Sequence, residues 1–364
     1  MICLNYLLMN ANAPVLRFSC ARDEYGEAIA QEKDWLSTVR PLGYRNLQSF
    51  LERRRAPKHR KHIDRLLQEY GCQDLEEFFR VTHAVSLNDT YWVKAEESSK
   101  TWADVSLYTN DFDEIVAEAA LNGNFSRESF SSTSPEFGTD GRYAKCWKRE
   151  DTGIWLYKAG SDTYELEPLS EVLAAQIAAV LCPKAVRYHL DYNHGRLVSK
   201  CKLFTTETVG LVKAADVVGD KRTIAELLPW FASIGGEDEF RRMCILDAVI
   251  LNTDRHLGNF GVNVWNSDQK VLGMAPVYDN NRSLLFDLDD DQLANPDWYI
   301  RRQTPRLGTD FIAAGRGLMT NTIRSDLKNL QGFEFFETDG IHVEGPRLPL
   351  LSGIVNRQIK KLLE

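Results

Sequence analysis

Apolar positions recur at helical spacing in several stretches of the chain, and each stretch predicts a helix. The clearest cover residues 57–70, 74–83, 168–181 and 237–251. In the second stretch Asp74 can cap the helix, and Glu77, three residues later, completes a capping box. Pro168 opens the third stretch and Pro183 follows its end. Proline is typical of these two positions, since it fits the first helical turn and cannot continue a helix.

Between the helices, short apolar runs bounded by turn residues predict strands. They cover residues 143–148, 154–158, 196–204, 260–265 and 270–277. Gly153 lies in the turn between the first two runs, so these two strands form a hairpin. The last two runs form a second hairpin, joined by a polar turn. The apolar stretch 1–9 lacks a basic start, which favours an ordinary strand or helix over a signal peptide.

This pattern divides the chain into three parts. Residues 1–120 form an N-terminal accessory region, residues 121–204 are turn-rich and then strand-rich, and residues 205–364 are mainly helical. The first part holds a basic run, which has two interpretations. It is either a solvated helix face or a contact for a phosphorylated or acidic partner. The run consists of Arg53, Arg54, Arg55, Lys58, Arg60, Lys61 and Arg65.

Composition narrows the classes of protein that the chain can belong to. The 364 residues carry 44 Lys and Arg against 52 Asp and Glu, a net charge of −8. An acidic balance disfavours a dedicated nucleic-acid binder. No apolar run is long enough to span a membrane. Seven scattered cysteines form no C-x-x-C pair, which argues against a disulfide framework or a cysteine zinc site and favours a cytoplasmic protein.

The candidate chemistry lies after the helix predicted at 237–251. Asp254 and Asn259 are five positions apart on the loop before the second hairpin, and Asp279 follows that hairpin. A hairpin returns the chain to its start, so Asp279 should lie beside Asn259. Carboxylate and amide oxygens suit Mg²⁺, and Asp254 could accept the proton of an attacking hydroxyl. Protein kinases space their catalytic Asp and metal-binding Asn in this way, although the spacing alone is also that of an ordinary Asx-turn loop.

Upstream residues favour the kinase interpretation. A kinase site also needs a strand Lys for the nucleotide phosphates and a helical Glu to position that Lys. Lys158 ends a predicted strand, and Glu171 lies in the first turns of the helix at 168–181. A Ser- and Gly-rich segment, 125–141, precedes both. The order of loop, Lys, Glu, Asp-x₄-Asn, hairpin and Asp indicates phosphoryl transfer more strongly than any single piece does.

At this point the sequence resembles a known family. The stretch Asp254-Arg255-His256-Leu257-Gly258-Asn259-Phe260-Gly261, followed by Pro276-Val277-Tyr278-Asp279, is similar to the HipA-like Ser/Thr kinases. The segment 86–94 is also similar to one found in HipA-domain proteins. The chain departs from the pattern of eukaryotic protein kinases, because it has no G-x-G-x-x-G and no A-P-E, and Asn280 follows Asp279.

The resemblance implies an α+β, two-lobed protein-kinase-like fold with ATP and Mg²⁺ as ligands. The lobe at 121–204 would be small, strand-rich and nucleotide-binding, and the lobe at 205–364 larger, helical and catalytic. Asp254 would be the catalytic base, and Asn259 and Asp279 would bind the metal. Lys158 would contact the nucleotide phosphates, and Glu171 would position that lysine. His256 would be either a nucleotide contact or a packed residue. Arg255 could pair with a nearby carboxylate. The hinge would comprise Cys201, Leu203 and Phe204, and the phosphate loop Ser131, Ser132, Thr133, Ser134, Gly138 and Gly141.

The resemblance also implies a regulation and a partner. A Ser or Thr among residues 131–134 would be autophosphorylated, which would place negative charge beside the ATP phosphates and inhibit the enzyme. The substrate would be a Ser or Thr hydroxyl of a protein. The chain would be the toxin of a toxin–antitoxin pair with a separate antitoxin-like protein, and no direct nucleic acid or membrane contact is expected. Two alternatives stay open: a lipid or small-molecule kinase on the same scaffold, and a catalytically weak interaction module.

Overall fold

The computed structural model describes residues 4–57, 60–72, 74–124, 134–163 and 165–364, and it divides into two compact units. The first unit comprises residues 1–158 with the later segments 203–212 and 263–271. The second comprises residues 159–202, 213–262 and 272–364. The three parts expected from the sequence stay a prediction.

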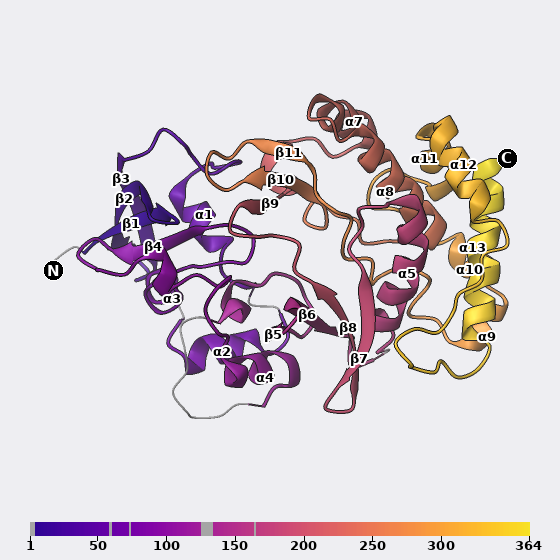
Figure 1. Ribbon diagram of the computed structural model, residues 1–364, viewed down its shortest axis with the longest axis horizontal. Helices are drawn as coiled ribbons and strands as arrows, with labels where there is room; N and C mark the ends of the chain where they lie inside the picture. The colour runs from indigo at the N-terminus through magenta and orange to yellow at the C-terminus, as the bar shows by residue number, and fades with distance from the viewer. Residues whose placement is uncertain (1–3, 58–59, 73, 125–133, 164) are drawn as a thin grey trace. The chain divides into compact units, whose positions relative to one another are not determined.

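A four-stranded antiparallel sheet opens the first unit (Figure 1). Its order is β3-β2-β1-β4, and its strands are β1 (Asn5–Asn10), β2 (Ala13–Arg22), β3 (Ala28–Trp35) and β4 (Tyr91–Ala95). The N-terminal stretch is therefore a strand. Tyr6 and Leu8 of β1 point into the core, as the period-two alternation of a strand requires. There they join Phe18 of β2, whose ring stacks on Tyr6.

Helices of the first unit bury their apolar faces in the same core. They are α1 (Leu47–Glu52), α2 (Ile63–Glu69), α3 (Leu75–Thr82) and α4 (Glu114–Asn122). The capping box of Asp74 and Glu77 is present at the start of α3. The helix predicted at 57–70 is shorter than expected. It begins at Ile63 because His62, with φ of 67°, is in the left-handed conformation and breaks the helix there.

The basic run is not a uniformly solvated face, so that interpretation is wrong for two of its members. Arg54 is buried and donates two hydrogen bonds to the Asp89 carboxylate, at 2.7 and 2.9 Å. Arg60 is also buried and donates to the carbonyl of Thr139 at 2.7 Å. Burial lowers the pKa of Arg60 to about 10. A basic stretch cannot by itself reveal which of its members fold inward, because that depends on partners distant in the sequence.

The first unit also holds the hairpin of β5 (Lys145–Glu150) and β6 (Gly153–Ala159), as predicted. Lys158 pairs with Lys145 in its antiparallel register. A short 3₁₀ turn, η2 (Pro135–Gly138), precedes the hairpin and buries Phe137 in the helical core. Glu136 of η2 is fully buried, and one of its carboxylate oxygens accepts the backbone N–H of Trp147 at 2.8 Å.

We expect Glu136 to make the stability of the chain depend on pH. Burial raises the pKa of Glu136 from 4.5 to about 7. The folded chain therefore holds this proton more tightly than the unfolded chain does, so stability should fall as the pH rises from about 4.5 to about 7. The shift corresponds to roughly 3 kcal/mol at most. Urea unfolding at pH 5, 6, 7 and 8 should show this slope in the wild type and a flatter one in Glu136→Gln.

A matched control for this slope is Glu24→Gln, since Glu24 is exposed in the turn between β2 and β3. That variant should keep the pH slope of the wild type. Parallel slopes for the wild type and Glu136→Gln would show that Glu136 does not carry a raised pKa in the folded chain.

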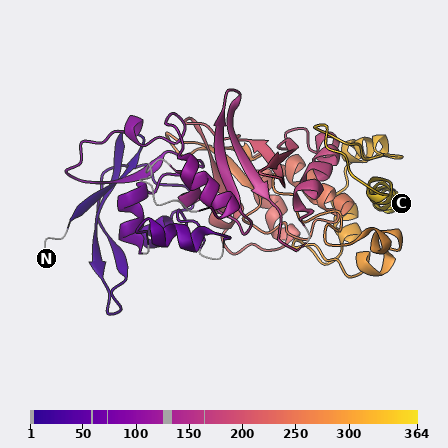
Figure 2. The same cartoon turned by 90° about the horizontal axis from the view of Figure 1, so that it is seen from below.

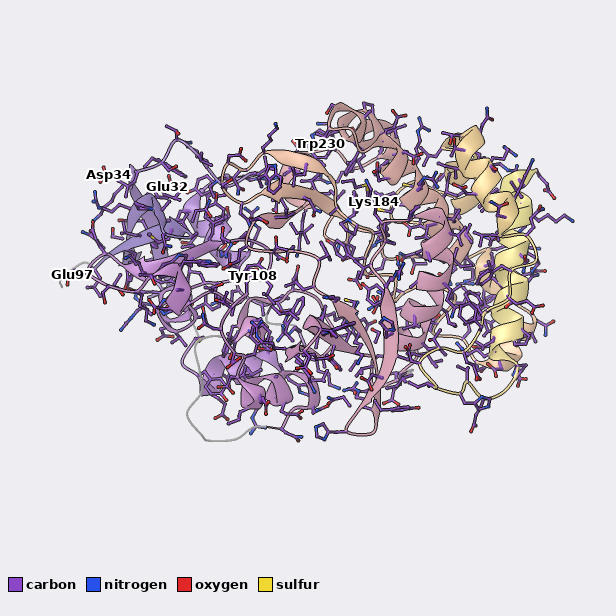
Figure 3. The ribbon with its side chains drawn as sticks, viewed as in Figure 1. Glu32, Asp34, Glu97, Tyr108, Lys184 and Trp230 are labelled. Carbon is purple, nitrogen blue, oxygen red and sulfur yellow. The ribbon has the colours of Figure 1, made fainter. Side chains whose placement is uncertain are left out.

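The second unit centres on two buried helices, α5 (Glu167–Leu181) and α8 (Glu237–Ile250), both predicted from the sequence. The hairpin of β7 (Tyr188–Asn193) and β8 (Arg196–Lys202) packs on α5. Only β8 was predicted. Lys184 lies in the turn after α5 (Figure 3), and its Nζ pairs with the carboxylate of Glu239 on α8 at 2.9 Å.

The second unit holds seven further helices among the described residues. They are α6 (Ala214–Val217), α7 (Ile224–Ser233), α9 (Asp290–Ala294), α10 (Asp297–Ile300), α11 (Phe311–Gly317), α12 (Asn321–Asn329) and α13 (Arg347–Leu363). Helices α11 and α13 both pack against α8, and α13 is seen along its axis near the C-terminus in Figure 2. The aromatic ring of Phe240 on α8 stacks on that of Phe231 on α7. No helix of the described residues is both long and apolar enough to cross a membrane.

A third sheet has three strands in the order β11-β10-β9. Its strands are β9 (Val209–Lys213), β10 (Gly261–Trp265) and β11 (Val271–Met274). The predicted second hairpin is thus present, with β11 shorter than expected. The amide of Ala275 donates to the carbonyl of Gly261 at 2.9 Å, so the chain that leaves β11 runs back beside the start of β10.

Candidate active site

The loop between α8 and β10 carries Asp254 and lies wholly in the second unit. Helix α8 ends at Leu251, which adopts the left-handed conformation with φ of 53°. Asn252 then turns inward and is fully buried. Its side chain accepts the amide of Asp254 at 3.0 Å and donates to Asp247 of α8 at 3.0 Å. The backbone of Asp254 is therefore anchored to α8 while its carboxylate stays partly exposed.

Arg255 fixes this loop against the segment that contains Asp279. Its side chain is 1% exposed and pairs with the Asp247 carboxylate, Nη2 to Oδ1 at 2.9 Å. Burial alone would lower the pKa of Arg255, but the charge and hydrogen bonds of Asp247, together with the charge of Asp279, outweigh burial and raise that pKa. The Nη1 atom donates to the carbonyl of Asn259 at 3.0 Å and to that of Tyr278 at 2.6 Å. One guanidinium nitrogen thus brings the residues on either side of the hairpin together.

Asn259 is oriented with its amide oxygen available. Its Nδ2 donates to the carbonyl of Asp254 at 2.9 Å, closing the five-residue loop. Tyr278 closes the same loop from the other side, since its hydroxyl donates to the carbonyl of Gly258 at 3.2 Å. Because both amide protons of Asn259 belong to Nδ2, its Oδ1 can act as a ligand or acceptor.

Asp279 is held by Tyr188, a residue that the sequence reasoning missed. Asp279 adopts the left-handed conformation with φ of 57°. Its amide donates to the Tyr188 hydroxyl at 3.0 Å. Tyr188 opens β7 and is buried, and burial raises its pKa well above 10, so the hydroxyl stays neutral. A left-handed Asp is uncommon, so this hydrogen bond helps to fix the backbone that directs its carboxylate.

Glu171 and Cys201 are also in the second unit and are both buried. Glu171, on α5, is fully buried and accepts the Ser199 hydroxyl of β8 at 2.6 Å. This hydrogen bond fixes the direction of the buried Glu171 side chain. Cys201 lies two residues further along β8. The chain then passes from the second unit to the first between Lys202 and Leu203, in the predicted hinge.

In the first unit, Lys158 is buried near the end of β6. Leu203 lies beside the same strand, since its amide donates to the carbonyl of Ile154 at 2.8 Å. Phe204 follows and is partly exposed. The predicted hinge residues Leu203 and Phe204 therefore belong to the unit that contains Lys158, while Cys201 belongs to the other unit.

Only part of the predicted phosphate loop can be placed. Ser131, Ser132 and Thr133 lie outside the described residues. Ser134 is buried at the start of η2. Gly138 ends η2, where a Cβ would approach the carbonyl oxygens of Arg54 and Val85 to 3.0 Å. Gly141 has φ of 104°, a conformation that favours glycine. From Ser134 to Gly138 the segment is packed within the first unit.

Two further residues flank Asp254. His256 is exposed, and its Nδ1 accepts the amide of Gly258 at 3.0 Å, so it is not packed in the core. Arg282 was missed by the sequence reasoning. Its Nη1 lies 4.0 Å from the Asp254 carboxylate, and its carbonyl accepts the amide of Thr253 at 3.2 Å. Its place three residues after Asp279 is the only sequence signal that could have found it.

The donor set at this loop suits a hard cation. Asn259 offers an amide oxygen and Asp279 a carboxylate, on segments that Arg255 holds together. Mg²⁺ takes one or two protein oxygens of this kind and completes its shell with water and phosphate oxygens. Within the described residues no group of three or more His, Cys, Asp or Glu side chains could hold a metal ion.

The fold places the chain in a structural class. It is the α+β fold of the HipA-like kinases, as expected from the motifs. HipA of Shewanella oneidensis MR-1, from a structure of a toxin–antitoxin complex with HipB and operator DNA, aligns with a TM-score of 0.61. The alignment covers 98% of this chain and 97% of that HipA, at 12% sequence identity. At this identity the likeness establishes the fold.

A second solved structure is similar over a smaller part of the chain. The proinflammatory kinase CtkA of Helicobacter pylori aligns with 62% of this chain and 90% of its own length. The sequence identity is 17% and the TM-score 0.48. No protein-family model and no curated protein matches the sequence.

Proposed function

We propose that this chain is an ATP- and Mg²⁺-dependent kinase that phosphorylates a Ser or Thr hydroxyl of a protein. The main support for the proposal is the loop at Asp254. Next to this proposed base, Arg255 donates hydrogen bonds to the backbone carbonyls of Asn259 and Tyr278. The likeness of the fold to that of HipA supports the proposal. For phosphoryl transfer the protein mainly has to position charges and takes little part in covalent chemistry. This loop can supply such positioned charges.

In the proposed reaction Asp254 accepts the proton of the attacking hydroxyl. A bond forms between that oxygen and the γ-phosphorus, the bond from the γ-phosphorus to the bridging oxygen breaks, and ADP leaves with the electron pair. Asn259 and Asp279 would hold Mg²⁺, which neutralises charge on the phosphate oxygens when bound. Asn252 and Arg255 keep the loop in place, so little reorganisation is needed as charge develops.

The nucleotide contacts are also proposed. Lys158 would contact the phosphates, and Glu171 would orient that lysine. The backbone at Cys201, Leu203 and Phe204 would hold adenine. Gly138 and Gly141 would belong to the loop over the phosphates, with His256 as a further contact at the nucleotide.

Regulation and partnership extend this proposal. Ser131, Ser132, Thr133 or Ser134 would be autophosphorylated, adding roughly −1.5 to −2 charges near the ATP phosphates and inhibiting transfer. An antitoxin-like protein would be a separate chain, by analogy with the HipA that was solved with HipB. We place the chain in the cytoplasm, which is supported by its scattered cysteines, none of which forms a disulfide among the described residues.

The test is phosphate transfer from labelled ATP with Mg²⁺, followed in protein and in an extracted lipid fraction. We expect label in protein for the wild type and none for Asp279→Asn. Intact mass would count phosphates on the chain itself, and peptide mapping would locate them. Label in lipid would favour a lipid kinase. Neither transfer nor ATP binding by the wild type would favour an interaction module and contradict the proposal.

A further inference from the structure

Arg282 is an arginine beside the proposed base whose hydrogen-bonding capacity is not used. The side chain is 36% exposed, and its Nη1 lies 4.0 Å from Asp254 Oδ1. Its Nε is buried without a hydrogen-bond partner, and no other side-chain hydrogen bond of Arg282 is found among the described residues. The guanidinium lies 5.7 Å from the ring centre of Phe286, which supports one face of its plane.

The backbone of Arg282 is fixed directly against the catalytic loop. Its carbonyl accepts the amide of Thr253 at 3.2 Å, so the residue before Asp254 is tied to Arg282. Its neighbours Asn281 and Ser283 are both buried, and the Ser283 hydroxyl donates to the carbonyl of Asn280 at 2.6 Å. Arg282 therefore extends from a rigid turn, and its guanidinium stays near Asp254 without being locked onto it.

A simple ion pair with Asp254 does not account for this geometry. An arginine that serves a carboxylate forms two parallel hydrogen bonds near 2.7–2.9 Å. Arg255 shows the contrast in this unit, since all three of its guanidinium nitrogens have acceptors within 3.0 Å. A buried donor left without a partner is unfavourable, because it has lost its hydrogen bond to water. At Arg282 this donor is Nε, while the Nη1 atom of the same guanidinium lies 4.0 Å from Asp254, where the proposed substrates react.

We propose that Arg282 binds the phosphoryl group during its transfer and donates hydrogen bonds to its non-bridging oxygens. This inference rests on the proposed kinase function. The attacking hydroxyl would lie about 2.6–3.2 Å from the Asp254 carboxylate, and the γ-phosphorus about 3–3.5 Å beyond it. A guanidinium 4.0 Å from that carboxylate reaches such a group. Its planar, permanently charged fork matches phosphate oxygens.

The bonds that form and break are those of the proposed phosphate transfer. The hydroxyl oxygen bonds to the γ-phosphorus, ADP leaves with the electrons of the broken bond, and the proton goes to Asp254. Arg282 gives up no proton. It stabilises the charge that spreads over the three equatorial oxygens in the transition state. The interaction of Arg282 with this transition state is stronger than its interaction with ATP in the ground state.

The experiment compares Arg282→Ala and Arg282→Lys with the wild type in single-turnover phosphate transfer. We expect Arg282→Ala to slow transfer about 100-fold or more, with less than a threefold change in ATP affinity. Arg282→Lys should recover part of the rate, and methylguanidinium chloride should partly rescue Arg282→Ala. Arg302→Ala is the matched control, because Arg302 is exposed in the same unit, and it should transfer at the rate of the wild type.

Three results would overturn the inference about Arg282. They are an unchanged rate in Arg282→Ala, a loss explained by ATP affinity alone, or a rate that recovers fully at higher pH because the arginine acts only on Asp254. An inactive wild type would instead contradict the proposed function itself. Circular dichroism and melting temperature should match the wild type, since the side chain is partly exposed.

Discussion

Asp254→Asn should reduce phosphate transfer by about 10²–10⁴-fold, which is the usual contribution of a general base. Asn keeps the shape of the side chain but cannot accept the proton. The Asp254 backbone bonds to Asn252 and Asn259 do not involve its carboxylate, so the loop should stay folded. Single-turnover transfer and ATP binding on the same sample give the measurement. We expect the rate to fall and the ATP affinity to change little.

Asp287→Asn is the control for this variant, because Asp287 is an exposed carboxylate in the same unit. It should transfer phosphate as the wild type does. Asp254→Asn with the rate of the wild type would show that another group accepts the proton, and Asp254 would lose its proposed role.

Arg255→Met should destabilise the second unit by about 3–5 kcal/mol, because it leaves the buried Asp247 carboxylate without its charged partner. It also removes the donor shared by the Asn259 and Tyr278 carbonyls. Burial already raises the pKa of Asp247, so the unpaired group should take up a proton more readily still. Urea unfolding of the full chain would measure the loss, and transfer activity should fall with it.

The double variant Asp247→Leu with Arg255→Met separates charge from packing. Removing both charges should recover much of the stability that Arg255→Met loses, since no unpaired ion then remains buried. Activity should not recover, because the bridge between Asn259 and Tyr278 is still absent. A double variant that is less stable than Arg255→Met would contradict this account of the pair.

Several elements were predictable because their signals are local. Helices α3, α5 and α8 bury stripes that recur at helical spacing, and the caps of α3 are adjacent in sequence. The β5–β6 hairpin is defined by a turn at Gly153. The α+β kinase-like fold followed from the order of these pieces and the resemblance to HipA-like kinases.

Other elements depend on contacts across long separations. In the first sheet β1 pairs with β4, about 85 residues later, and no periodicity near either strand indicates that partner. Arg54 and Arg60 turn inward because Asp89 and the Thr139 carbonyl receive them. The sequence presented both arginines as part of one basic run. Burial of a charged residue is decided by such partners and not by its neighbours in the chain.

The same division holds at the candidate site. The spacing of Asp254 and Asn259, and the hairpin that returns Asp279 to them, are properties of the sequence, because a five-residue loop and a short hairpin close locally. Three other contacts exist only in the tertiary structure. Arg255 pairs with Asp247, the Tyr188 hydroxyl accepts the amide of Asp279, and Arg282 lies near Asp254. Each depends on packing that joins residues 8 to 91 positions apart in the chain. The chain's sequence thus determined which groups can react, and the fold decided which groups hold them in place.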